Sequence, residues 1–446
     1  MRKSLFGISA VMLFNVSIGM AQVQDSLLRT PLRWDLQTCL EYARKNNLQV
    51  QSLQQTRLSE EQNMLLAKAA KFPSLSGAMS QALVNSKNAD PVVGGFQTQA
   101  NFSSNYSLSS SVTLFNAGYL NNNIRQSQLN VQIAQLNVDA AINSITLQIT
   151  QAFLNILLVK ENIVYLDTLL ATSQAQLKQG TQQYNAGSIA RKDYLQFEGQ
   201  VASDQYNLIA AKNTYRQNLL TLKQILQLSS AVDFDIAAPD SLAVQPVLPS
   251  LQDAELTALQ LRPEIKASQL SVDAAALELK KSKAGRWPTI SLGASLASGY
   301  SDNQSSAYFT QLNNNFYQRG VLSMAIPIFT NRTVKTAIEQ SKIQIEQARI
   351  SLLGTRLTLD QAVEQSYISL LNAQSQFSAA DVQFKANEET YNITREQLRL
   401  GAVNMVDLLQ QRNLYIQALQ AYIQSKYSAI LNRKIFDFYT GVPVTL

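Results

Sequence analysis

The sequence predicts a mainly helical protein that also carries paired β-strands, built by duplication of one unit. The segment KAAKFPSLS at residues 68–76 returns as KAGRWPTIS at 283–291, an offset of 283 − 68 = 215. The segment AGSIARKDYLQ at 186–196 returns as LGAVNMVDLLQ at 400–410, an offset of 401 − 187 = 214. Two landmarks in the same order at nearly the same offset indicate a duplicated fold, in which each copy runs helix, strand pair, long helix, turn and helix.

Composition excludes several classes of function. The 446 residues include no His and one Cys, and the formal net charge is +6. These counts exclude His-based catalysis, His metal sites, CxxC redox chemistry and an intramolecular disulfide. The basic residues are scattered rather than clustered with aromatic residues, which argues against nucleic-acid binding. We therefore expect no enzyme activity, no cofactor and no metal site.

The first 21 residues have the pattern of a secretory signal peptide. A basic pair, Arg2 and Lys3, precedes a short apolar core at 5–18, and a small-x-small cleavage site follows at 19–21. Later apolar runs are shorter than the ~20 residues that a spanning helix needs. The sequence therefore predicts an exported chain that meets a membrane only through strands.

Each copy begins with a helix and changes period at a proline. Residues 35–70 have apolar residues at helical spacing, and Pro73 ends this helix because it lacks an N–H. The period then becomes 2, as after Pro288, where apolar residues alternate with Ser, Thr and Gly. The predicted strands are residues 74–84, 103–115, 288–300 and 320–329.

The predicted strands suit a membrane β-barrel. Each is about 10–13 residues long, which is close to the length that a tilted strand needs to cross a bilayer. One face is apolar, the other is small and polar, and aromatic residues gather at the segment ends. A soluble sandwich also alternates, but four strands in two separate hairpins cannot close a core. The connections at 84–101 and 301–317 are rich in Asn, Ser and Gln and are expected to be exposed loops.

A very long helix follows each second strand. Residues 120–185 contain no proline, and their apolar seam from Ile145 to Leu177 advances in alternating steps of four and three. A helix of ~66 residues is roughly 100 Å long, which suits a fibre or a tube wall. Gly187 and Gly401 end the two long helices, and a second helix returns. The predicted organisation is a signal peptide (1–21), an N-terminal extension (22–34), a first repeat (35–232), a linker (233–250), a second repeat (251–440) and a C-terminal tail (441–446).

Four strands alone leave open edges, which cannot persist in lipid, so the barrel must close by assembly. Two copies give 8 strands, whose interior is filled by side chains, whereas three copies give 12. A trimer is the smallest closed assembly with a lumen.

The duplicated motifs resemble the TolC family of outer-membrane efflux proteins. The resemblance rests on A-x-x-x-P-x-[IL] at both helix-to-strand junctions, [IL]-F-[NT] after the second and fourth strands, and L-x-x-G-x-x-x-x-x-D-x-L at the helix tips. It implies a trimeric channel-tunnel, with a 12-strand barrel in the outer membrane and a coiled-coil α-helical barrel in the periplasm. It also implies a periplasmic adaptor and an inner-membrane pump, of RND or ABC type, as partners. The chain would be the passive exit duct of a tripartite efflux or type I secretion system.

The resemblance places a periplasmic gate near the second tip. It implies that Asp407 contributes to a ring of carboxylates, while Gln410 replaces the second acidic position of the family, which predicts weaker cation block. Arg399 could bridge neighbouring helices and hold the tip closed. Asp407 and Arg399 each also have a local explanation, since an acid in a first turn and a base in a last turn interact favourably with the helix dipole.

Two further groups of residues are candidates for contacts outside the protomer. Phe72 and Trp287, each preceding a junction proline, could anchor the barrel at the membrane interface or pack locally against that proline. The second group is the expected adaptor contacts, which are Gly187, Ser188, Ile189, Gly401, Ala402, Val403 and Asn404.

Two function classes remain as alternatives. One is a structural coiled-coil envelope protein without paired strands, and the other is a periplasmic adaptor with one hairpin and no duplication.

Overall fold

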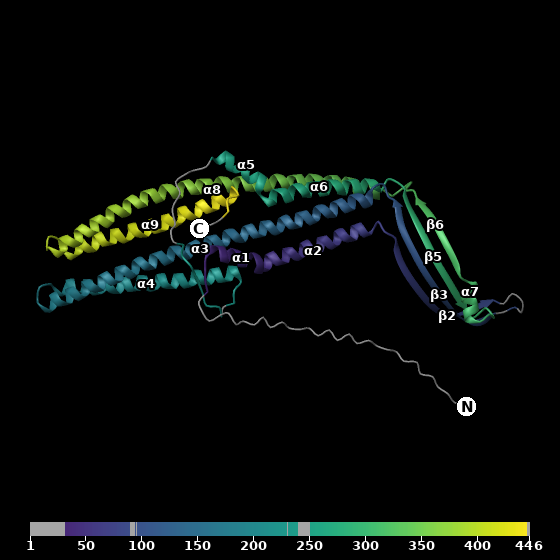
Figure 1. Ribbon diagram of the computed structural model, residues 1–446, viewed down its shortest axis with the longest axis horizontal. Helices are drawn as coiled ribbons and strands as arrows, with labels where there is room; N and C mark the ends of the chain where they lie inside the picture. Colours follow the sequence, from purple (N-terminus) through teal and green to yellow (C-terminus); the bar gives the residue numbers. More distant parts are fainter. Residues whose placement is uncertain (1–31, 90–93, 95, 230, 240–249, 444–446) are drawn as a thin grey trace, which may run out of the picture.

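The protomer is elongated and mainly helical, with a β-sheet at one end (Figure 1). At the other end are two helical tips, which are the turns where each long helix is followed by a returning helix. The computed structural model describes residues 32–443, apart from 90–93, 95, 230 and 240–249. The predicted signal peptide, 1–21, lies outside the described residues, as do most of the N-terminal extension and most of the linker. The described chain follows the predicted duplicated order, so the predicted fold class is confirmed.

The opening helix of each copy is broken in two, whereas the sequence predicted one continuous helix over 35–70. Helix α1 covers Leu36–Asn46 and α2 covers Leu48–Ala69. The Asn47 side chain accepts hydrogen bonds from the N–H groups of Gln49 (2.9 Å) and Val50 (3.3 Å), so a new helix begins there. In the second copy, α5 (Leu251–Leu261) ends before Pro263, which opens α6 (Pro263–Ala284).

Four strands from both copies form one antiparallel sheet in the order β2-β3-β5-β6. Strand β2 (Ser74–Ala89) and β3 (Phe96–Phe115) extend beyond the predicted limits of 84 and 103, because their backbone pairing continues through the polar residues of the connection. Strand β5 is Thr289–Ser301. Strand β6 is Tyr317–Ala325 and stops short of the predicted 329, consistent with the lack of an N–H at Pro327.

The two faces of the sheet differ in chemistry, as the alternation predicted. Paired positions such as Met79↔Tyr106, Leu108↔Leu296 and Leu292↔Leu322 make one face apolar. The other face is mostly Ser, Gly, Ala and Thr, with Ser76 and Ser109 hydroxyls 2.9 Å apart. Leu75 is 72% exposed and Leu322 68% exposed on the apolar face. An apolar face this exposed requires a hydrophobic surrounding.

The connection between β5 and β6 differs from the predicted loop. It contains a short helix, α7 (Tyr308–Asn314), at the end of the sheet farthest from the long helices (Figure 1). The buried Gln311 side chain donates to the carbonyls of Gln304 (3.2 Å) and Ser306 (2.7 Å), so this connection has a defined structure.

The long helices are α3 (Tyr119–Asn185) and α8 (Thr333–Arg399), and each packs on several shorter helices along its length. Near the sheet α3 packs on α2 and α6, and toward its tip on α4 (Arg191–Leu226). Helix α8 packs on α6 and then on α9 (Met405–Tyr439). Contrary to expectation, one 18-residue window of α3 is apolar enough to span a membrane, with a mean hydropathy of 1.4. Its apolar residues instead supply much of the protein core.

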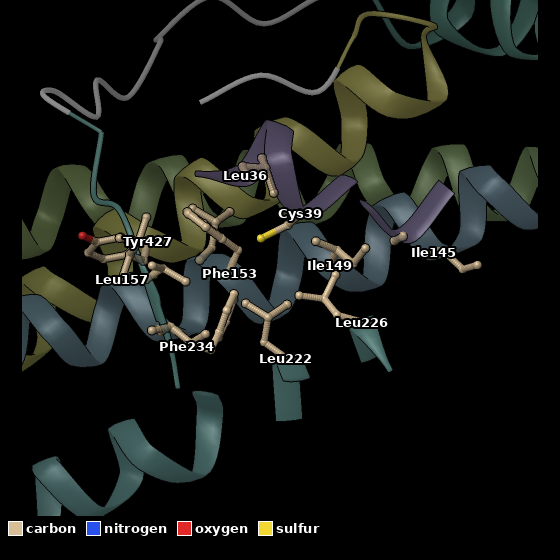
Figure 2. Close-up of a cluster of buried hydrophobic side chains, with 14 of the residues drawn as sticks. Leu36, Cys39, Ile145, Ile149, Phe153, Leu157, Leu222, Leu226, Phe234 and Tyr427 are labelled. Atoms are coloured by element: carbon tan, nitrogen blue, oxygen red, sulfur yellow. The ribbon is translucent and has the colours of Figure 1, made fainter. Parts of the chain in front are cut away.

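The main core lies midway along the molecule, where α1, α3, α4 and α9 meet (Figure 2). Cys39, Ile149, Phe153 and Leu222 point toward one another there, each at most 1% exposed. Two short strands, β1 (Leu32–Trp34) and β4 (Phe234–Ile236), pair in parallel across this core. Their residues were predicted to belong to the N-terminal extension and the linker, so this sheet was not predicted from the sequence.

Candidate functional site: the paired helical tips

Both tips end in the same hydrogen-bonded turn. Gly187 has φ = 76° and Gly401 has φ = 72°, in the left-handed region that glycine adopts most readily. The N–H of Ser188 donates to the Gln183 carbonyl at 2.8 Å, and the N–H of Ala402 donates to the Gln397 carbonyl at 2.8 Å. This is the Schellman arrangement, which satisfies the last carbonyls of each long helix. The two glycines therefore act as helix caps in the fold.

The predicted adaptor-contact residues lie together on the two tips. Gly187, Ser188, Gly401, Ala402 and Asn404 are exposed, whereas Ile189 and Val403 are partly buried at matching positions. Each tip thus presents small and polar groups around one apolar side chain. This composition suits docking of a second helical tip, and the adaptor role of these residues remains a prediction.

Asp407 lies in the first turn of α9, where its carboxylate forms a capping box with Asn404. The Asn404 N–H donates to Asp407 Oδ2 at 3.3 Å, and the Asp407 N–H donates to Asn404 Oδ1 at 3.1 Å. Both residues are exposed, as is Gln410 one turn farther along. The first tip is different, since the N-cap of α4 is Ala190, whose side chain makes no cap. Asp407 thus has a local structural role as well as an exposed carboxylate.

Arg399 forms an ion pair within its own helix. Its Nε and Nη2 atoms lie 2.9 and 2.6 Å from Glu396 Oε1, one turn earlier. This pairing raises the pKa of Arg399 and lowers the pKa of Glu396. Within the described protomer Arg399 therefore contacts its own helix, and the predicted bridge to a neighbouring helix remains a prediction about the assembly.

A buried ion pair that was not predicted from the sequence joins the two copies. Arg412 of α9 is 0% exposed, and its Nη2 lies 2.5 Å from Oδ2 of Asp204 on α4. Gln200 donates to the other Asp204 oxygen at 2.9 Å. Arg412 Nε and Nη1 have no hydrogen-bond partner among the described residues. The pair joins α9 of one hairpin to α4 of the other, about two turns of α9 from the second tip.

The burial pattern of α9 near the tip is in step with Arg412. Met405, Leu408 and Arg412 are buried there, whereas Val406 is 51% exposed. The signal in the sequence was that Arg412 follows Met405 and Leu408 at helical spacing. Val406 and Leu409, each one position farther along, offered another apolar stripe and concealed that signal.

The aromatic side chains at the two helix-to-strand junctions are exposed on the surface of the protomer. Phe72 is 73% exposed and Trp287 is 63% exposed. The N–H of each donates a hydrogen bond to a carbonyl at the end of the preceding helix, so the two junctions form the same turn. They precede Pro73 and Pro288, where the helices give way to the sheet. This exposure is compatible with contact at the membrane interface, and the anchoring role of both residues remains a prediction.

These features define a class of protein, a duplicated helical tunnel subunit that contributes strands to a membrane sheet. The family profile described as "Outer membrane efflux protein" matches residues 39–227 and 256–438, one match for each copy. The chain therefore belongs to the outer membrane efflux protein family. It is accordingly an outer-membrane protein whose helical part lies in the periplasm.

Curated relatives are distant but cover much of the chain. "Toxin and drug export protein A" of Aggregatibacter actinomycetemcomitans is 26% identical over 65% of this chain and 61% of its own length. "Outer membrane protein TolC" of Escherichia coli is 26% identical over 65% of this chain and 60% of its own. The match thus spans about three fifths of these relatives. "Outer membrane efflux protein BepC" of Brucella suis is 22% identical over 87% of this chain and 81% of its own.

Solved structures share the fold over nearly the whole chain. The Campylobacter jejuni CmeC outer membrane channel matches with a TM-score of 0.77 at 16% identity, covering 99% of this chain and 94% of that one. The outer membrane protein VceC of Vibrio cholerae matches with a TM-score of 0.75 at 14% identity, covering 91% and 96%. Paired strands and duplication together contradict the two alternative classes, a strand-free coiled-coil protein and a single-hairpin adaptor.

Proposed function

We propose that this protein is the passive outer-membrane exit duct of a tripartite efflux or type I secretion system. The observation that carries the proposal is the four-stranded sheet with an exposed apolar face, joined directly to helices of 67 residues. One protomer thereby connects a membrane-embedded part to a long periplasmic part. The small polar face of the sheet would line the bore.

The duct is a homotrimer in this proposal. Strands β2 and β6 are the edges of the described sheet, and their free backbone groups cannot remain unpaired in lipid. Pairing β6 of one protomer with β2 of the next closes a barrel. Three protomers give 3 × 4 = 12 strands, and the long helices then surround a common axis below the barrel.

A periplasmic adaptor and an inner-membrane pump complete the machine. The adaptor would dock on the tips at Gly187–Ile189 and Gly401–Asn404, where the exposed turns present a small apolar centre. An RND-type or ABC-type pump would supply the energy, and the duct itself would perform no chemical step. The names of the relatives from Aggregatibacter and Brucella, which mention export and efflux, support this assignment.

The experiment that tests the duct combines mass and conductance. Native mass spectrometry of the detergent-extracted protein should give a trimer, and the trimer should form channels in planar bilayers. Deletion of the gene should sensitise the cells to exported compounds, and re-expression should restore resistance. A stable monomer in mild detergent, or a trimer without conductance under any applied voltage, would contradict the proposal.

A further inference from the structure

Helix α7 lies on the apolar face of the sheet, which is the membrane side of the proposed barrel. The hydroxyls of Tyr308 and Tyr106 are 2.6 Å apart, and the rings of Tyr308 and Tyr300 are 4.8 Å apart. Ser298 Oγ donates to the Leu312 carbonyl at 2.5 Å. Tyr106 pairs with Ser298 in register, and both share a face with Leu108 and Leu296. The connection therefore folds outward over the barrel wall rather than across the bore.

A groove opens on this face beside α7. It has a volume of 460 Å³ and is lined by Gly77, Met79, Tyr106, Leu108, Leu296 and Phe316, together with neighbouring backbone. Its walls are aliphatic and aromatic, and the Tyr106–Tyr308 hydroxyl pair forms a polar rim on the α7 side. Glycine at position 77 leaves the floor open, since an added Cβ would meet only Leu108 at 3.9 Å and the Ser107 carbonyl at 4.0 Å.

The location of the groove identifies its occupant. Helix α7 is at the end of the sheet opposite the long helices (Figure 1). The α7 side of the groove, at Tyr106 and Phe316, is therefore its outer-leaflet side, and the groove runs from there toward Gly77. Phe309 is 82% exposed and Phe316 is 50% exposed beside it, as aromatic residues are at a membrane interface. A groove continuous with a lipid-facing surface is filled by hydrocarbon, and its polar rim lies on the headgroup side.

We infer that this groove binds one acyl chain of an outer-leaflet lipid, with the lipid headgroup beside the Tyr106–Tyr308 pair. The inference rests on the proposed function, because the apolar face must be the outside of the barrel. A seated chain would hold α7 against the wall and keep this connection clear of the exit.

The test compares lipid retention in two leucine variants. Gly77→Leu fills the groove, whereas Gly320→Leu adds the same side chain to the same face outside the groove, where nothing lies within 4 Å. Trimers extracted from outer membranes in mild detergent are washed, and bound lipid is measured by native mass spectrometry. We expect wild type and Gly320→Leu to retain lipid and Gly77→Leu to lose it severalfold. Equal retention in all three proteins, or no lipid on wild type, would overturn the inference.

A second measurement applies if Gly77→Leu fails to assemble. In a Trp34→Phe/Trp287→Phe background, Phe316→Trp reports on the groove and Leu322→Trp on the open lipid face. Each protein is loaded with lipids brominated along the acyl chain and is then transferred into plain detergent. Quenching of the Trp fluorescence should persist at position 316 and disappear at 322. Loss at both positions would overturn the inference. A conducting trimer that retains no lipid removes only the groove assignment, whereas absence of a trimer removes the duct itself.

Discussion

At the scale of single residues, glycine at the two tips has a role that another residue cannot fill without strain. Gly401 has φ = 72°, while Gly354, in the middle of α8, has an ordinary helical position with nothing within 4 Å of an added Cβ. The same substitution should therefore have opposite effects at the two sites.

We expect Gly401→Ala to lower the free energy of unfolding by about 1–2 kcal/mol, the cost of the left-handed conformation for a residue with a Cβ. Gly354→Ala should raise it by about 0.5–1 kcal/mol, because alanine has the better helix propensity. Urea unfolding of the detergent-solubilised protein measures both. Destabilisation of similar size at both sites would contradict the role assigned to Gly401.

Cys39 provides a second prediction at this scale. Its side chain is 0% exposed in the core, and burial raises the pKa of the thiol from an ordinary value of 9.0 to about 12. The folded protein should therefore resist alkylation by iodoacetamide at the pH where half of an exposed thiol is ionised. In urea the same thiol should react fully, and rapid labelling of the native protein would show that this core is open.

The raised pKa also fixes the direction of a pH effect on stability. A thiol whose pKa is higher in the folded state contributes stability that is fully present below its unfolded pKa. That contribution falls as the pH rises from the unfolded pKa of 9.0 toward the folded value of about 12. Cys39→Ala should remove this component of the alkaline destabilisation, as measured by urea unfolding across that interval.

At the scale of elements, the buried pair Arg412–Asp204 joins α9 of the second copy to α4 of the first. The two hairpins otherwise meet here mainly through apolar contacts, such as those of Leu408 with neighbouring aromatic residues. A buried charge pair of this kind contributes to the specific placement of the hairpins more than to net stability.

Arg412→Met should destabilise the protein by about 3–5 kcal/mol, since it leaves the Asp204 carboxylate buried without its cation. The double variant Arg412→Met/Asp204→Leu should recover most of this loss, because it replaces the pair with apolar groups of similar volume. Urea unfolding of these two variants, of Asp204→Leu and of the wild type completes a double-mutant cycle. Additive losses would show that the two side chains do not act as a pair.

At the scale of the whole molecule, the two tips of the protomer differ, and the proposed trimer would contain three copies of each. The second tip carries Asp407 in a capping box, whereas the first carries Asp193 after an uncapped Ala190. In the proposed trimer, three Asp407 carboxylates would surround the axis at the periplasmic end.

Asp407→Asn should reduce block by divalent cations in planar bilayers, because it removes three negative charges from the constriction. Asparagine retains an oxygen that can accept the Asn404 N–H, so the helix cap remains and the effect isolates charge. Asp193→Asn is the matched control and should leave the block unchanged. An unchanged block in Asp407→Asn would remove this residue from the gate.

Much of this architecture was predictable because it depends on local rules. The change of period after Pro73 and Pro288, the glycine caps and the heptad seams each follow from the chemistry of residues close together in the sequence. Duplication then strengthened each assignment, since the same patterns appear twice, in the same order and at nearly the same offset. The breaks at Asn47 and Pro263 were equally local, and the polar and proline signals for them were present.

The sequence by itself thus determined the order of elements, the two faces of the sheet and the positions of the tips. Only the tertiary structure decided that β1 pairs with β4, that Arg412 meets Asp204, and that α7 lies on the apolar face of the sheet. Each of these contacts joins segments whose local patterns permit several partners. Which partner is chosen depends on how the packed helices and strands position them, and this information is absent from any single stretch of the chain.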